Sequence, residues 1–280
     1  MNYVIKTMTL GEILDQAFNL LKNHFKMLMT ISLYMMVPLQ IIQQLVLLKT
    51  GPGLGITPGM TPQASLQVLL MMLPYLIIQF ISSMLIIFVA WPLTEGAVLR
   101  AIASEYLDKR TTPQECMRES FKKFGSLLGT HLLSGLIVIL GLICFVVPGI
   151  YFIYKYFFAI HAVMIEDKSG SEALSRSGEL MKGNFGTAFV LSLLLFVINI
   201  VAVAAANIIP SAVAHVVLQV AIQAVMFSLT LAASVVFYFS CRCNLENFDL
   251  SILAGAVQGD LPPAGAPVPA PAPQSSTLPQ

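Results

Sequence analysis

Long apolar segments alternate with short amphipathic stretches along this chain of 280 residues. At 1.5 Å per residue, a helix of about 20 apolar residues crosses about 30 Å of hydrocarbon. The segments that approach or exceed this length are residues 27–48, 69–91, 126–147, 150–165, 187–208 and 212–240. The pattern predicts an all-α polytopic membrane protein with six transmembrane helices.

A short amphipathic helix is expected before the first, third and fifth of these segments. In residues 9–25, apolar side chains recur at i, i+3, i+4 and i+7, so we expect this helix to lie at the membrane interface. Its sequence, TLGEILDQAFNLLKNHF, is similar to SGSEALSRSGELMKGNF at residues 169–185 and more weakly to TPQECMRESFKKF at residues 112–124. The similarity predicts three repeated units, each an amphipathic helix plus a transmembrane hairpin. They span about residues 9–91, 112–165 and 169–240.

Each predicted amphipathic helix opens with a hydroxyl residue that is followed three positions later by glutamate. This is the spacing of a capping box, in which the hydroxyl oxygen and the carboxylate accept hydrogen bonds from free amides at the start of the helix. The candidate pairs are Thr9/Glu12, Thr112/Glu115 and Ser169/Glu172.

The composition identifies the bilayer as the solvent for much of the chain. Hydrophobic residues make up 57% of the sequence and charged residues 10%, whereas soluble domains contain about 25% charged residues. A net charge of +1 offers no basic face and argues against a nucleic-acid partner. Residues 1–250 therefore form one predicted membrane domain, with membrane lipids as its expected partners.

The end of the chain has a different composition. Residues 251–280 are rich in proline and alanine. Such a segment cannot build a core, so we expect a disordered cytoplasmic tail. This tail is a candidate contact for another membrane or cytoplasmic protein.

The basic residues predict how the protein is oriented in the membrane. Six spans place both termini on one side, and of the 15 Lys and Arg residues only Lys49 and Lys155 fall outside that side. By the positive-inside rule, both termini and the three amphipathic helices are expected in the cytoplasm.

Two ionisable residues fall within the fourth apolar segment, where such groups are costly. Lys155 either extends to the outer headgroups or holds a lipid phosphate between helices. His161 is either a functional group within the membrane or a neutral histidine hydrogen-bonded to a neighbouring helix. Both residues are therefore candidate lipid or polar contacts.

Charged residues at the end of the sixth segment suggest a closure of the helix bundle. Arg242 and Glu246 have i, i+4 spacing and can pair on the helix surface. In the alternative arrangement, Arg242, Glu246 and Asp249 dock onto the basic cytoplasmic helices.

Motifs of catalysis and cofactor binding are absent from the sequence. No nucleophile–base pair, P-loop or dinucleotide-binding glycine motif occurs. Histidines of different segments lack metal-ligand spacing, and Cys241 and Cys243 are too few ligands by themselves. We therefore expect no enzyme activity, no cofactor and no metal.

Four pieces of sequence carry a resemblance to a known family. They are LGEILDQAFNLLKNHF, GAVLRAIASEYLDKR, PGIYFIYKYFFAIHAVMIEDKSGSEALSRSGELMKGNF and YFSCRCNLENFDL. Together they resemble the membrane domain of bacterial membrane-anchored glycerophosphodiester phosphodiesterases and its stand-alone relatives of unknown function. A phosphodiesterase barrel needs about 250 residues and has no room here. The resemblance therefore implies a fold and a location in the bacterial inner membrane, and not the phosphodiesterase activity.

These observations favour a non-enzymatic membrane protein that organises lipids or scaffolds partner proteins. The alternative is a small transporter or lipid translocase, because prolines and ionisable groups interrupt the spans and internal repeats are common in transporters.

Overall fold

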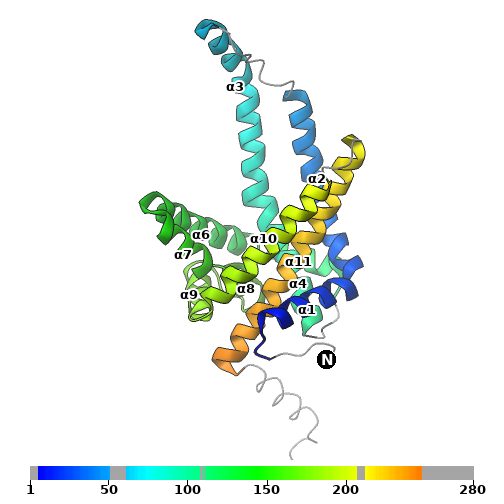
Figure 1. Ribbon diagram of the computed structural model, residues 1–280, viewed down its shortest axis with the longest axis vertical. Helices are drawn as coiled ribbons and strands as arrows, with labels where there is room; N and C mark the ends of the chain where they lie inside the picture. The colour runs from blue at the N-terminus through cyan, green and yellow to red at the C-terminus, as the bar shows by residue number, and fades with distance from the viewer. Residues whose placement is uncertain (1–5, 51–60, 108, 110, 207–211, 248–280) are drawn as a thin grey trace, which may run out of the picture.

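The computed structural model describes residues 6–50, 61–107, 109, 111–206 and 212–247, and these contain helices and no strand (Figure 1). The prediction of an all-α protein is confirmed. The helices are α1 (Leu10–Asn23), α2 (Phe25–Thr50), α3 (Pro62–Leu85), the π-helix η1 (Ile86–Ala90), α4 (Trp91–Tyr106), α5 (Pro113–Lys122), α6 (Phe124–Cys144), α7 (Val146–Lys155), α8 (Ala159–Ile165), α9 (Gly170–Met181), α10 (Phe185–Ala206) and α11 (Ala212–Glu246).

Several helices are long and apolar enough to cross a membrane. By length and composition, the described residues contain five such segments: Leu66–Tyr106, Phe124–Cys144, Val146–Ile165, Phe185–Ala206 and Val217–Glu246. Helix α2 adds a shorter apolar stretch, Phe25–Pro38, within its described part. The chain therefore has the helices of a membrane protein, while six spans and a three-unit repeat stay predictions. The predicted tail, residues 251–280, lies outside the described residues.

The second predicted span continues into the helix that follows it. Helices α3, η1 and α4 form one uninterrupted rod from Pro62 to Tyr106, with π geometry over Ile86–Ala90. Pro92, in the first turn of α4, has no amide hydrogen to donate to the carbonyl four residues earlier. The widened π turn lies directly before this proline, as expected where a regular α-helical hydrogen bond is missing.

The fourth predicted span is interrupted and does not form a single helix. Helix α6 ends at Cys144, Phe145 is extended with φ −163° and ψ 151°, and α7 begins directly afterwards. The chain therefore turns at Phe145, while Pro148 and Gly149 lie inside α7. Gly149 allows α7 to cross α6 closely, since a Cβ there would lie 2.3 Å from Leu142 Cδ2. A turn between Lys155 and Ala159 then separates α7 from α8.

Helix α1 packs against the bundle through its apolar face. Ile13, Ala17 and Leu20 are buried in the main core, and α1 contacts α11 along its length. Tyr106 of α4 stacks on Phe239 of α11 with ring centroids 5.3 Å apart. The hydroxyl of Tyr106 donates to Oε1 of Gln16 in α1 at 2.9 Å. The amphipathic face predicted for residues 9–25 thus contacts protein in this structure.

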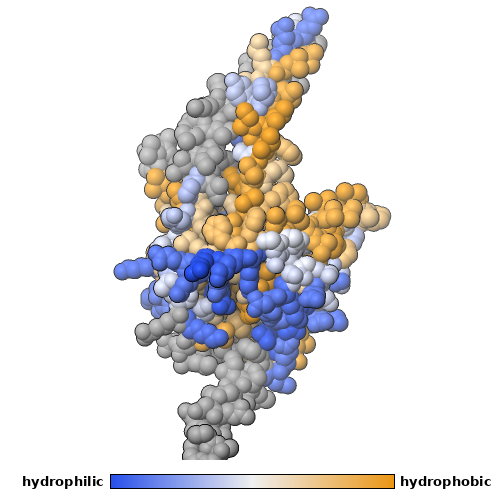
Figure 2. All heavy atoms as spheres, turned by 180° about the vertical axis from the view of Figure 1, so that it is seen from behind, coloured by the Kyte–Doolittle hydropathy of each residue, from blue (hydrophilic) through white to orange (hydrophobic). Residues whose placement is uncertain are grey.

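Polar and apolar residues separate into two zones of the surface. Figure 2 shows a hydrophilic zone below and a mainly hydrophobic zone above it. Large exposed apolar side chains come from α3, α6, α7 and α10, including Leu73, Ile139, Ile150 and Val201. Apolar surfaces of this extent are typical of helices that face lipid chains. The fold therefore places the charged short helices beside an apolar zone.

Candidate functional site

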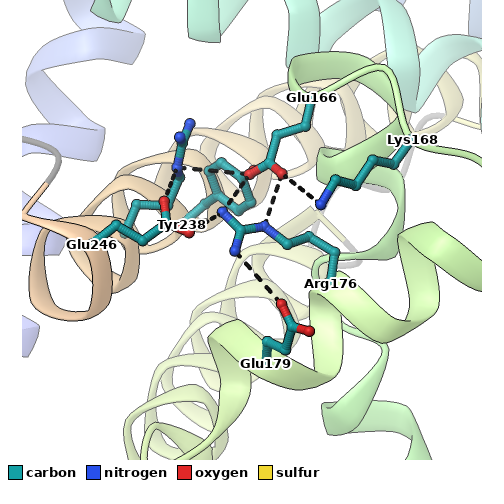
Figure 3. Close-up of polar contacts among 7 residues, drawn as sticks. Glu166, Lys168, Arg176, Glu179, Tyr238 and Glu246 are labelled. Atoms are coloured by element: carbon teal, nitrogen blue, oxygen red, sulfur yellow. Dashed lines mark hydrogen bonds and ion pairs between the residues drawn. The ribbon is translucent and has the colours of Figure 1, made fainter. Parts of the chain in front are cut away.

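A carboxylate in the loop after α8 is the centre of an ionic cluster. We call the set formed by Glu166, Lys168, Arg176, Glu179, Tyr238, Arg242 and Glu246 the Glu166 cluster (Figure 3). Its members come from the α8–α9 loop, from α9 and from the last turns of α11. The cluster joins segments that are about 70 residues apart in sequence, as the separation of 72 between Glu166 and Tyr238 shows.

Arg176 binds Glu166 through two nitrogens. Its Nε donates to Oε2 at 2.8 Å and its Nη2 donates to Oε1 at 3.0 Å. This is the bidentate geometry in which an arginine–carboxylate pair is strongest. The hydroxyl of Tyr238 donates to Oε1 of the same carboxylate, and Lys168 Nζ lies 3.6 Å from Oε2.

A second carboxylate extends the cluster along α11. Glu246 forms ion pairs with Arg176 and with Arg242, whose Nε donates to Glu246 Oε2 at 3.0 Å. Arg242 Nε also lies 3.6 Å from Glu166 Oε1. Arg242 and Glu246 therefore pair with each other as predicted, and Glu246 also pairs with Arg176 of α9 while Arg242 lies beside Glu166 of the α8–α9 loop. Asp249 lies outside the described residues.

The ionisation of the cluster follows from these contacts. Burial raises the pKa of Glu166, but hydrogen bonds from Arg176 and Tyr238 outweigh it, and the pKa lies below its ordinary value. Burial lowers the pKa of Arg176, but its hydrogen bonds to Glu166 and Glu246 outweigh this, and the pKa is raised. Both groups are thus charged at neutral pH, which suits a structural ion pair and not a proton donor.

Helix α9 also supports the interruption between α7 and α8. Ser177 is fully buried, accepts a hydrogen bond from the Phe158 amide at 2.9 Å and donates one to the Lys155 carbonyl at 2.9 Å. These backbone groups lie in the turn where the regular helical ladder is broken. A single hydroxyl of α9 therefore satisfies one donor and one acceptor at this turn.

Lys155 lies at this interruption and packs on α9. A Cβ at Gly178 of α9 would lie 3.2 Å from Lys155 Cε. The Lys155 Nζ lies 5.9, 5.8 and 5.7 Å from the ring centroids of Tyr151, Phe152 and Tyr156. Lys155 thus packs against α9 and three aromatic rings, and both alternatives for its role, at the outer headgroups or on a lipid phosphate, stay predictions.

His161 is buried in α8, with 2% of its surface exposed. Its Nε2 lies 2.9 Å from Ser234 Oγ of α11, and its ring stacks on Tyr238 with centroids 5.6 Å apart. Because Ser234 donates its own hydrogen to the Leu231 carbonyl, the Nε2–H tautomer fits this contact. The hydrogen bond to a neighbouring helix agrees with the second of the two alternatives for His161, and Nδ1 has no partner among the described residues.

Two of the three predicted capping boxes are present. Thr9 and Glu12 in α1, and Thr112 and Glu115 in α5, make both reciprocal hydrogen bonds. Their hydrogen bonds lower the pKa of Glu12 to about 2, where the side-chain contact with Lys6 is the largest cause, and also lower the pKa of Glu115.

The third capping box, Ser169 with Glu172, is absent, and that prediction is wrong. Gly170 has φ +54°, in the left-handed region, so the chain enters α9 without the geometry that a capping box requires. Thr130 of α6 accepts the hydrogen bond of the Gly170 amide at 2.9 Å. Tertiary contact therefore replaces the local cap.

A cavity of about 480 Å³ lies apart from the Glu166 cluster, between α2, η1, α4, α10 and α11. Most of its wall is apolar, and uncharged polar side chains from three helices also line it. Its lining residues are Met36, Ile86, Ala90, Trp91, Thr94, Asn199, Gln223, Met226, Phe227 and Thr230. Cavities of about 300–1,000 Å³ with apolar walls and few polar groups are typical small-molecule sites.

Sequence reasoning alone missed the two central residues of the cluster and the polar residues of the cavity. Glu166 and Arg176 carry no local motif, because their partners lie in α11. Asn199 offered a signal, since it is an amide inside the apolar run FVLSLLLFVINIVAVAAA. In the described part of the chain, no group of three metal-ligating side chains occurs.

Comparison with known proteins gives one family match. The family described as "Domain of unknown function (DUF7847)" matches residues 120–241. This range runs from the end of α5 into α11 and includes Lys155, His161, Glu166, Arg176 and Tyr238. No curated protein and no solved structure matches the chain. The chain is thus similar, over this range, to a family without an assigned function.

Proposed function

We propose that this chain is a non-enzymatic integral membrane protein of the bacterial inner membrane that organises lipids or scaffolds partner proteins. The Glu166 cluster is the observation that carries this proposal. Its cations, Lys168, Arg176 and Arg242, are matched by three carboxylates at short range. Groups neutralised in this way hold helices together and are poorly suited to acid–base catalysis.

The arrangement of the short helices supports the same proposal. Helices α1, α5 and α9 each precede a long helix and carry charged residues beside the apolar zone. Basic side chains at this position favour the negatively charged cytoplasmic leaflet. A rigid, charged platform at the membrane surface suits lipid organisation or the docking of a partner.

Native mass spectrometry of the full chain, ejected from its own membrane, tests the proposal. We expect discrete lipid adducts, or a complex with another protein that is lost when residues 261–280 are deleted. A bare chain with neither lipid nor partner would contradict the proposal. So would a measured turnover that a single substitution in the Glu166 cluster abolishes.

A small transporter or lipid translocase is the second candidate, and the 480 Å³ cavity is the observation that favours it. Interruptions lie near or within the apolar helices, namely the π turn η1 and the break between α7 and α8. Discontinuous helices often surround the binding sites of transporters. Proteoliposomes that show flux of a lipid or solute, above that of protein-free vesicles, would favour this candidate over a static role.

A further inference from the structure

We propose that the cavity between α2, η1, α4, α10 and α11 binds an uncharged membrane lipid with a hydroxyl-bearing headgroup, of the diacylglycerol class. The inference rests on the proposed lipid-organising function and names the class of lipid. It concerns a site apart from Lys155 and the Glu166 cluster.

The polar groups of the cavity come from different helices and face one space. Thr94 belongs to α4, Asn199 to α10, and Gln223 and Thr230 to α11. Thr94 is buried and donates its hydroxyl hydrogen to the Ala90 carbonyl at 2.7 Å, so its oxygen is left to accept. Together, the amides and hydroxyls can donate to and accept from a ligand hydroxyl.

Polar side chains at these positions are costly if the cavity holds only hydrocarbon. Asn199 lies inside the candidate span Phe185–Ala206, and Thr230 lies inside Val217–Glu246. In lipid, a polar group without a hydrogen-bonding partner is unfavourable. Within the part of the chain that the structure describes, Asn199 makes no hydrogen bond through its side chain. A ligand headgroup supplies the missing partner.

The lining excludes a charged headgroup. No Asp, Glu, Lys or Arg is among the described residues that line the cavity. The nearest acid along α4, Glu95, accepts a hydrogen bond from the Trp91 side chain one turn away and does not line the space. A phosphate or carboxylate would thus have no counter-charge in a medium of low dielectric constant.

The volume limits the size of the bound part. At about 30 Å³ for each water-sized group, a cavity of 480 Å³ holds about 16 such groups. This is close to one acyl chain, or to a small headgroup with part of a chain. The remainder of a two-chain lipid would extend into the bilayer along the exposed apolar surface.

The protein contains its own reporter for this site. Trp91 lines the cavity, packs edge-to-face on Phe227 at 5.2 Å, and is the single tryptophan of the chain. Its fluorescence therefore reports contact with a quencher in the cavity. Because Trp91 is 45% exposed, lipids of the surrounding bilayer also reach it. The reference is therefore a second lipid that carries the same brominated acyl chains.

The experiment titrates a diacylglycerol with brominated acyl chains into vesicles of phosphatidylcholine that contain the full-length protein. We expect quenching that saturates at a low mole fraction and exceeds the quenching by phosphatidylcholine with the same brominated chains. The variants Asn199→Leu and Thr230→Val should each raise the mole fraction of diacylglycerol at half-maximal quenching by about two- to tenfold. This is the effect of losing one neutral hydrogen bond.

Gln79→Leu is the matched control, because it removes an amide from α3 outside the cavity. It should leave the titration unchanged. Equal quenching by both brominated lipids, or saturation that Asn199→Leu and Thr230→Val leave intact, would overturn the proposal. Selective quenching by brominated phosphatidylglycerol or a brominated alkylamine would also overturn it, since the ligand would then be charged.

The two proposals fail in different ways. If native mass spectrometry retains lipid adducts but the brominated diacylglycerol does not saturate, the cavity assignment is wrong while lipid organisation stands. If neither lipid nor partner protein is retained, the proposed function itself is wrong.

Discussion

At the scale of single residues, Arg176 contributes most to the Glu166 cluster. Its side chain is 12% exposed and forms ion pairs with Glu166, Glu179 and Glu246. Removing one partner of a buried ion pair costs more than the pair contributes, because the remaining charge stays buried. The stability of the cluster should therefore depend strongly on this arginine.

Arg176→Ala should destabilise the folded protein by about 3 kcal/mol, because Glu166 would keep its burial and lose its bidentate partner. This corresponds to a thermal midpoint lowered by about 6–12 °C in detergent. The thermal midpoint is measured by heating samples and using size-exclusion chromatography to quantify the protein that stays folded. Arg118→Ala is the control, because Arg118 is exposed on α5 and should change stability by less than about 0.5 kcal/mol. Equal losses of stability in Arg176→Ala and Arg118→Ala would contradict the central role of Arg176 in the Glu166 cluster.

The cluster also predicts a dependence of stability on pH. The pKa of Glu166 is lower in the folded state than its ordinary value of 4.5. The stability it contributes is therefore fully present above pH about 4.5 and is lost as pH falls through the folded-state pKa. The thermal midpoint of the unmodified protein should exceed that of Glu166→Gln at pH 7, and the difference should shrink below pH about 4.5.

The midpoint of Glu166→Gln is subtracted from that of the unmodified protein at each pH. This subtraction removes the contributions of Glu12 and Glu115, whose pKa values are also lowered. Glu172→Gln serves as the control, since Glu172 is exposed and makes no capping hydrogen bond. A difference that stays constant from pH 7 to pH 3 would show that ionisation of Glu166 does not contribute.

At the scale of elements, α9 holds several neighbouring segments together. It binds the α8–α9 loop and α11 through Arg176, and the turn between α7 and α8 through Ser177. Lys123, the residue between α5 and α6, adds a further contact, since its Nζ donates to the Val163 carbonyl in the last turn of α8 at 3.1 Å. Side chains of neighbouring elements therefore stabilise the interruption between α7 and α8, in place of regular backbone hydrogen bonds within one helix.

Ser177→Ala should loosen the turn between α7 and α8, because a buried amide and a buried carbonyl lose their shared partner. The expected cost is about 1–3 kcal/mol. Hydrogen–deuterium exchange of peptides that cover residues 150–165 should become faster. Ser192→Ala is the control, since its hydroxyl donates only to the Ala188 carbonyl within α10. Unchanged exchange in Ser177→Ala would contradict the bracing role.

At the scale of the whole molecule, the α6–α7 hairpin decides how many segments cross the membrane. Figure 1 shows this hairpin directed to one side while α2 and α3 extend upward. With α7 at 10 residues, it is about 15 Å long and spans a bilayer only together with α8. The proposal of six spans therefore depends on this hairpin.

Cys144 offers a direct test, because it is exposed at the end of α6 while Cys116, Cys241 and Cys243 are buried. If the hairpin crosses the membrane, a membrane-impermeant maleimide should label Cys144 in intact cells. Lys122→Cys, in α5, should react only in inverted membrane vesicles. Labelling of Cys144 only in inverted vesicles, or from neither side, would contradict the crossing and lower the number of spans.

The comparison of sequence and structure is clearest at the helix starts. The boxes at Thr9 and Thr112 were predictable, since a capping box involves residues three positions apart. Ser169 has the same spacing but lies after Asp167, which has φ +58°, and before Gly170 in a left-handed conformation. Contacts of Lys123 with Asp167 and of Thr130 in α6 with Gly170 decide the geometry of this loop, and these contacts have no local signature.

The sequence by itself determined the features that depend on neighbours along the chain. The apolar runs specify the long helices, and the hydroxyl–glutamate spacing specifies the capping boxes that begin α1 and α5. The i, i+4 spacing of Arg242 and Glu246 fixes their pairing along one helix face. Each of these follows from helix geometry and hydrophobicity, which act over a few residues.

Only the tertiary structure decided which distant groups meet. Glu166, Arg176 and Tyr238 converge because α11 packs beside α9, and no spacing in the sequence records that distance. The break between α7 and α8 persists because Ser177 reaches its backbone from another helix. The cavity beside Trp91 forms because five helical elements leave a space between them. Side chains of separate helices pack together and bring these groups into contact. The hydrophobic and polar pattern along the sequence does not record which helices pack together.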